Sequence, residues 1–281
     1  MAEFIRETLL LLPFLFATYL VLEAVEAHAG GALERFLRRA RFIGPAAGAL
    51  AGAVPQCGVS TAAASFYAGG AITVGTLLAV FLSTSDELVP VLLSERAPLS
   101  LLVKIIGLKC VCAVAVGFTA NGVLAFMRHI RRDVSVHELC EHSRCGCHRH
   151  KGILVPALIH TLEIFAFIVV ISGALEFCMH MWGEDCLLKL KLASPILGEA
   201  IAGALGLVPN CAVSVASANL FLSGAMSPGA MMASSFTNAG VGFLVLFRTN
   251  RNLRENLAVL LSVYAIGVVL GILSGPLIAL R

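Results

Sequence analysis

Val54-Pro55-Gln56-Cys57-Gly58-Val59-Ser60 in the first half of the chain is matched by Val208-Pro209-Asn210-Cys211-Ala212-Val213-Ser214 in the second half. The match extends without a gap over residues 44–79 and 198–233. Fourteen of the 36 aligned pairs are identical, so this is an internal repeat and not a chance motif. Both copies lie in very apolar sequence. Paired apolar segments that are interrupted by Gly and Pro at corresponding places are the best sequence indication of a transport site. The repeat therefore predicts a transporter.

The composition agrees with a membrane protein. Only 13% of the residues are charged, against about 25% in ordinary soluble domains, and 58% are hydrophobic. Several apolar runs reach or approach the roughly 20 residues that cross a bilayer: residues 9–25, 71–93, 99–127, 153–177, 229–247 and 257–280. The net charge of +3 forms no continuous basic face, which excludes a nucleic-acid-binding protein. We expect the first run to be a retained helix and not a cleaved signal peptide, because it ends in Glu23 and Glu26.

The distribution of arginine predicts the topology. Arg-rich segments at 35–41, 128–151 and 248–254 should be cytoplasmic. Two full helices already cross the membrane between the first and second of these segments. Residues 44–68 must therefore leave and return on the same side as a re-entrant hairpin, and the same reasoning applies to the second copy.

Counting each hairpin arm as a helix gives five helices per repeat. Because this number is odd, the two copies should be inverted, with both termini outside. We thus predict an all-α polytopic membrane protein made of two inverted repeats with re-entrant Pro-Cys hairpins. The repeats are residues 1–127 and 152–281, and a cytoplasmic Cys/His-rich linker, residues 128–151, joins them.

The tips of the two hairpins are candidate substrate-binding sites. Pro55 and Pro209 interrupt helical hydrogen bonding, which leaves carbonyl groups and half-helix ends available to a ligand. Neutral oxygen and soft sulfur donors accompany them: Gln56, Cys57, Ser60, Asn210, Cys211 and Ser214. The alternative is a pair of proline kinks packed by small residues. Two such tips in register favour a site.

A second candidate site is Thr84-Ser85-Asp86-Glu87, inside the apolar run 71–93. A charged residue there is costly and is by default a functional hypothesis. The four residues also read as a capping box, with Thr84 as N-cap, so we expect the helix to break at Ser83 and restart at Thr84. We predict Asp86 and Glu87 as ligands of a transported metal ion. The alternative is a polar helix end near the outer surface.

The second half has a corresponding break at Thr237-Asn238-Ala239-Gly240, but without a carboxylate. Asn238 is therefore expected to add a neutral oxygen donor to a single cation site.

Two further groups have open interpretations. His160 and Glu163 lie three residues apart on one helix face and suit a proton relay, a metal-ligand pair or an interfacial salt bridge. In the linker, residues 137–150 contain four His and three Cys, which suit zinc or softer metals. The candidate loop ligands are Cys140, Cys145, Cys147 and His148. The alternative is a flexible basic loop in which these residues are incidental.

The twin Pro-[Gln/Asn]-Cys-x-x-Ser motifs, the Cys-rich central loop and the following His-Thr pair resemble the ten-helix heavy-metal exporters. The resemblance covers essentially the whole chain. Members of that family are labelled manganese transporters or arsenic efflux proteins. The resemblance implies a multi-pass protein of a prokaryotic inner (plasma) membrane that exports a metal or metalloid.

The sequence thus predicts a secondary transporter that works by alternating access, because no nucleotide-binding motif is present. A divalent cation needs an intramembrane carboxylate to offset its charge, so the acidic pair favours metal export, with manganese preferred. Arsenite or organoarsenical efflux is the alternative. A membrane-embedded enzyme is the rival class and a channel is a third. We expect no resident cofactor and no nucleic-acid partner. The expected partners are the transported metal ion and the lipid bilayer, and a homodimer is left open.

Overall fold

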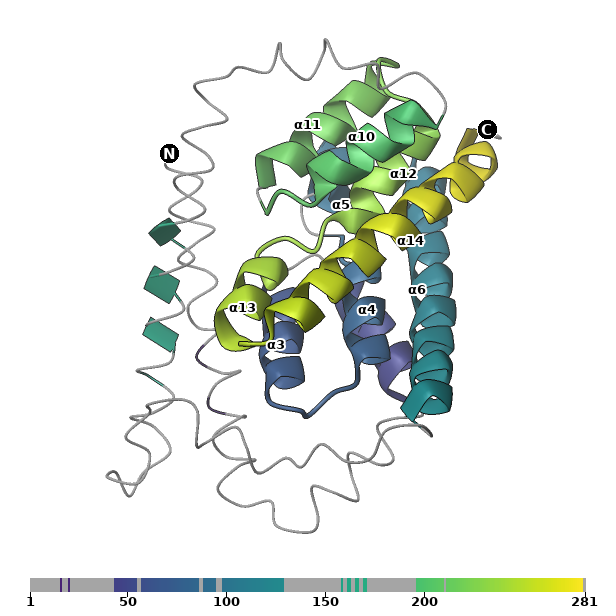
Figure 1. The fold of residues 1–281 in the computed structure, drawn as a ribbon. Coiled ribbons are helices and arrows are strands. Elements are labelled where there is room, and N and C mark those ends of the chain that lie inside the picture. The colour runs from purple at the N-terminus through teal and green to yellow at the C-terminus, as the bar shows by residue number, and fades with distance from the viewer. Residues whose placement is uncertain are drawn as a thin grey trace, which may run out of the picture.

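The structure is a computed structural model of the 281-residue chain. It describes residues 43–54, 57–85, 88–94, 98–128, 196–209 and 211–279, together with isolated positions near residues 16–20 and 158–170. These residues form helices and no strand, as the sequence predicts. Figure 1 shows the arrangement and gives the helix labels used below.

The helices repeat along the chain with a constant offset. The first half contains the helix Ile43–Gly52 and then α3 (Cys57–Ala68), α4 (Val74–Ser83), α5 (Leu88–Ser94) and α6 (Leu99–Arg128). The second half contains α10 (Leu197–Gly206), α11 (Cys211–Leu222), α12 (Pro228–Thr237), α13 (Gly242–Thr249) and α14 (Leu253–Ala279). Each helix of the second half begins 154 residues after its counterpart in the first. The repeat therefore continues through α6 and α14, beyond the stretch where the two sequences align visibly.

Packing within the two halves also repeats. A Cβ atom at Gly52 would collide with the hydroxyl of Ser83 at the end of α4. Gly206 has the same relation to the hydroxyl of Thr237 at the end of α12. All four residues obey the offset of 154, so the same close helix approach is built twice. Neither the helix bounds nor these contacts fix the orientation of the halves in a membrane, and the inverted relation stays a prediction.

The two halves of the chain contact each other at the centre of the molecule. In Figure 1, α13 lies beside α3 and α5 lies near α11, and both pairs are in contact. Gly242 makes the first contact possible, because a Cβ there would lie only 2.8 Å from the Cβ of Ser60. Phe81 and Phe243 pack edge to face beside it, with ring centroids 5.0 Å apart. The helix that follows each Pro-Cys tip therefore contacts a helix of the other half: α3 contacts α13, and α11 contacts α5.

Three stretches are long and apolar enough to cross a membrane: Leu99–Ala125, Pro228–Thr249 and Leu253–Ile278. The most apolar windows of the first and third are only 22% and 28% buried, whereas that of the second is 78% buried. Large apolar side chains such as Val111 on α6 and Leu261 on α14 are exposed. Exposed apolar side chains on long helices suit lipid. We conclude that α6 and α14 face the bilayer and that the broken helix α12–α13 lies inside the bundle.

The predicted break in the run 71–93 is confirmed, since α4 ends at Ser83. The predicted capping box is wrong. The next helix, α5, begins at Leu88, and Thr84 is instead the C-cap of α4. The physical reason is that Thr84 belongs to the end of α4: its backbone N–H and its hydroxyl both donate to the carbonyl of Val80, the hydroxyl at 2.7 Å, and Ser85 is not helical.

The predicted hairpin arms are short. The helices before and after each tip have 10 to 12 residues, which corresponds to about 15–18 Å, or roughly half of a 30 Å hydrocarbon core. A single arm therefore cannot cross the membrane. Pro55, Gln56 and Asn210 at the tips lie outside the described residues, and the re-entrant hairpin stays a prediction.

Candidate functional site

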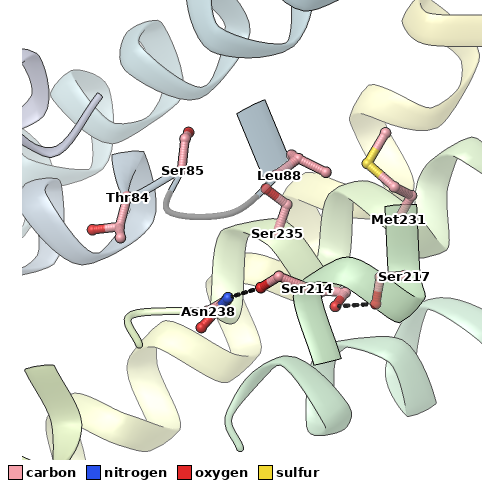
Figure 2. Close-up of a pocket in the computed structure, with 9 residues that line it drawn as sticks. Thr84, Ser85, Leu88, Ser214, Ser217, Met231, Ser235 and Asn238 are labelled. Carbon is pink, nitrogen blue, oxygen red and sulfur yellow. Dashed lines mark hydrogen bonds between the residues drawn. The ribbon is translucent and has the colours of Figure 1, made fainter. Parts of the chain in front are cut away.

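A cavity lies where the end of α4 and the start of α5 meet α11 and α12 (Figure 2). Nine residues line it: Thr84, Ser85, Leu88, Ser214, Ser217, Met231, Ser234, Ser235 and Asn238. Seven of the nine carry a side-chain oxygen, although the helices that supply them are apolar overall. The cavity is therefore a polar site among apolar helices.

The wall from the second half is held by hydrogen bonds between its own side chains. The amide of Asn238, the C-cap of α12, donates to the hydroxyl of Ser214 on α11. Its carbonyl oxygen accepts from the backbone N–H of Gly240 at 2.9 Å, which fixes the orientation of the amide. The hydroxyls of Ser217 and Ser234 lie 3.1 Å apart and join α11 to α12. Figure 2 shows Asn238, Ser214 and Ser217 together on one side of the cavity.

The opposite wall is the C-terminal end of α4. Thr84 and Ser85 are 3% and 2% exposed. Their hydroxyls donate back to α4, that of Thr84 to Val80 and that of Ser85 to the carbonyl of Ser83 at 3.1 Å. The backbone carbonyl of Thr84 accepts a different donor, which the sequence analysis missed.

That donor is Lys109 on α6, whose side chain is completely buried. Its Nζ donates to the carbonyl of Thr84, and to the carbonyl and hydroxyl of Ser235 at 2.8 and 2.7 Å. The ring centroid of Phe236 lies 5.8 Å from Nζ, within the range of a cation–π interaction. In sequence Lys109 is three residues from Cys112, the middle of the span Leu99–Ala125. A charged residue at that depth is itself a functional signal, and it could have been read from the sequence.

The oxygens around this ammonium belong to two helix ends. Thr84 directly follows α4, and Ser235 lies in the last turn of α12. The C-terminal end of a helix carries a partial negative charge from its unpaired carbonyls. In transporters with discontinuous helices, such carbonyl ends coordinate cations. The geometry at Lys109 is therefore that of a site for positive charge.

A family model described as "Putative, 10TM heavy-metal exporter" matches residues 9–185, more than half of the chain. The chain belongs to this exporter family. No curated protein and no solved structure matches it. Membership, together with the long apolar helices, indicates a membrane protein of a heavy-metal exporter family.

The serines that line the cavity of the exporter in the second half do not all have polar counterparts in the first half. The residues of the first half that correspond to Ser217, Ser234 and Ser235 are apolar: Ala63, Val80 and Phe81. Phe81 is completely buried and packs against Phe243 at the place corresponding to the cavity. The buried ring of Phe81 thus stands in the first half where the second half has the hydroxyl of Ser235.

The structure brings together two of the predicted site residues, Ser214 and Asn238, which both line the cavity. Ser60 is buried against Gly242, outside the cavity lining, and Pro209 lies in the turn before α11. The remaining predicted residues or their side chains lie outside the described part of the exporter: Pro55, Gln56, Cys57, Asp86, Glu87, Cys140, Cys145, Cys147, His148, His160, Glu163, Asn210 and Cys211. Their roles stay predictions. In the described ranges no three His, Cys, Asp or Glu residues form a metal-binding group.

Proposed function

We propose that this exporter carries a divalent metal cation, with manganese as the preferred cargo, through the cavity between its two broken helices. The observation that supports this most strongly is the position of the Lys109 ammonium. It is held by oxygens of Thr84 and Ser235, where α4 and α12 end. These oxygens already accept a positive charge in the apolar interior.

The side chains of the cavity favour a hard cation. The lining is dominated by hydroxyl and amide oxygens, and manganese prefers oxygen ligands to sulfur. A divalent charge must be offset in a site of low dielectric. Asp86 and Glu87 follow Ser85 directly in the chain, and we propose that they supply the negative charge.

The transport cycle that we propose is alternating access in a secondary transporter. The two halves would be inverted repeats of about five helices each in the inner membrane, with the Arg-rich loops cytoplasmic. The contact between α5 and α11 supports this cycle, since the two helices belong to different halves and both carry cavity-lining residues, so that relative movement of the halves would change the cavity. The chain has no nucleotide-binding motif, so we propose that an ion gradient drives export.

Export of a neutral arsenical is the second candidate, and Lys109 is the observation in its favour. A positive charge beside the cavity repels a second cation, whereas it can donate to a neutral hydroxylated species. The serine hydroxyls of the lining can both donate to arsenite and accept from it.

The variant Asp86→Asn distinguishes manganese export from arsenical export. Purified protein in liposomes would be tested for manganese counterflow, and an efflux-deficient host would be tested for tolerance to manganese and to arsenite. We expect Asp86→Asn to lose at least about tenfold in manganese affinity, because it removes a charge that offsets the cation. Glu255→Gln on α14 is the matched control, since Glu255 is an exposed acid. Unchanged protection against manganese by Asp86→Asn would reject the cation site and leave the arsenical reading.

A further inference from the structure

We propose that the ammonium of Lys109 is a tethered cation that occupies the oxygen ligands of the cargo when the cavity is empty. Cargo binding would then displace it. This proposal rests on the proposed function, because it requires a cationic cargo.

The contacts of Lys109 are those of a ligand-bound cation more than those of a packed side chain. Nζ is bonded to one oxygen of Thr84 and to two of Ser235, and both residues line the cavity. Two of these acceptors are backbone carbonyls at helix ends, where the helix dipoles favour positive charge. A metal ion in the cavity would seek these same oxygens.

Shared ligands make the two cations exclusive. Lys109 and a divalent ion cannot use the oxygens of Thr84 and Ser235 together, and their charges repel strongly in a poorly screened interior. The lysine ammonium ends a flexible four-carbon stem, so it can leave without a movement of the α6 backbone. Binding of cargo and departure of the ammonium are therefore one exchange.

The ammonium also joins the two halves of the exporter. Lys109 and Thr84 belong to the first half, and Ser235 lies 126 residues from Lys109, in the second. The counterpart of Lys109 on α14 is Val263, which is completely buried, so the repeat does not supply a second tethered cation at that position. The residues of α4, α5 and α12 include no titratable side chain. Asp86 and Glu87 are the acids that the chain places next to this site in sequence.

This arrangement assigns Lys109 a role in the step in which the empty carrier reorients after it has released its cargo. With the cargo released, the vacated oxygens would be neutralised by the ammonium, and the empty carrier could reorient. Manganese–manganese exchange needs no empty return, whereas net efflux does. Loss of the ammonium should therefore stop net efflux, preserve exchange and tighten binding.

The test compares Lys109→Gln with Lys104→Gln, which makes the same change at an exposed lysine of α6. Each protein would be reconstituted into liposomes and assayed for manganese counterflow, net manganese efflux and equilibrium manganese binding. For Lys109→Gln we expect about tenfold tighter binding, counterflow close to that of the unmodified protein and at least about a tenfold loss of net efflux. Lys104→Gln should leave all three unchanged.

Parallel loss of counterflow and net efflux in Lys109→Gln, or binding no tighter than in Lys104→Gln, would overturn the proposal. Lys109→Met retains an unbranched side chain of similar length and guards against a folding defect caused by the amide. If both Lys109 variants lose counterflow, the lysine is structural and the tethered cation is rejected. Absence of manganese counterflow in the unmodified protein would instead reject the proposed function, and the tethered cation with it.

Discussion

The serine pair that joins α11 to α12 gives the sharpest test of the cavity as the cargo site. Ser217 and Ser234 are 7% and 2% exposed, and their hydroxyls lie 3.1 Å apart. The substitution Ser217→Ala places in the second half the residue that the first half has at Ala63, on the matching helix. The alanine is therefore compatible with this helix packing.

The expected effect on stability is small. The variant leaves the hydroxyl of Ser234 without Ser217, and an unsatisfied buried polar group costs about 1–3 kcal/mol. The lower value is expected, because a serine in a helix can donate to the carbonyl one turn back.

The expected effect on transport is larger. A hydrogen-bonding group that meets a charged partner contributes about 1.5–3 kcal/mol, which corresponds to about a ten- to hundredfold change in affinity. Ser217→Ala should raise the manganese concentration for half-maximal counterflow by that factor while the protein stays folded at the assay temperature.

Ser223→Ala is the matched control. Ser223 follows α11 directly, is exposed and donates its hydroxyl to Leu220 at 3.0 Å, away from the cavity lining. The reasoning is refuted if Ser217→Ala changes the half-maximal concentration no more than Ser223→Ala does.

Two other substitutions test the contact between the halves and the role of sulfur. Gly242→Ala should lower the melting temperature and slow transport, because its Cβ would press on α3 and overpacking costs about 1–3 kcal/mol. Gly107→Ala is the control, since Gly107 has open space around it, and it should not change the melting temperature. Equal effects of the two substitutions would contradict the close approach of Gly242 to α3. Cys57→Ser or Cys211→Ser should reduce transport of a soft metal or an arsenical far more than transport of manganese, measured by counterflow with each substrate. An equal loss for all substrates would mean that the cysteines only pack.

The sequence by itself determined the class of protein and the repeat. Apolar runs of membrane length and a motif repeated at a constant spacing are local patterns, and both persist in the helix bounds of the structure. It also located the helix break after Ser83, because a run of hydroxyls and acids is costly inside an apolar helix. Ser214 and Asn238 were predicted for the same reason, as polar residues beside breaks in matching positions of the repeat.

Only the tertiary structure decided which polar groups meet. Ser214 and Ser217 lie three residues apart on one face of α11, but the sequence does not show which helix that face meets; contact with α12 brings Ser217 against Ser234 at the cavity. A lysine in an apolar helix can extend to the membrane surface or turn inward, and its position in the sequence does not distinguish these outcomes. Lys109 turns inward because the ends of α4 and α12, distant in the chain, converge beside it and offer carbonyl oxygens to its charge.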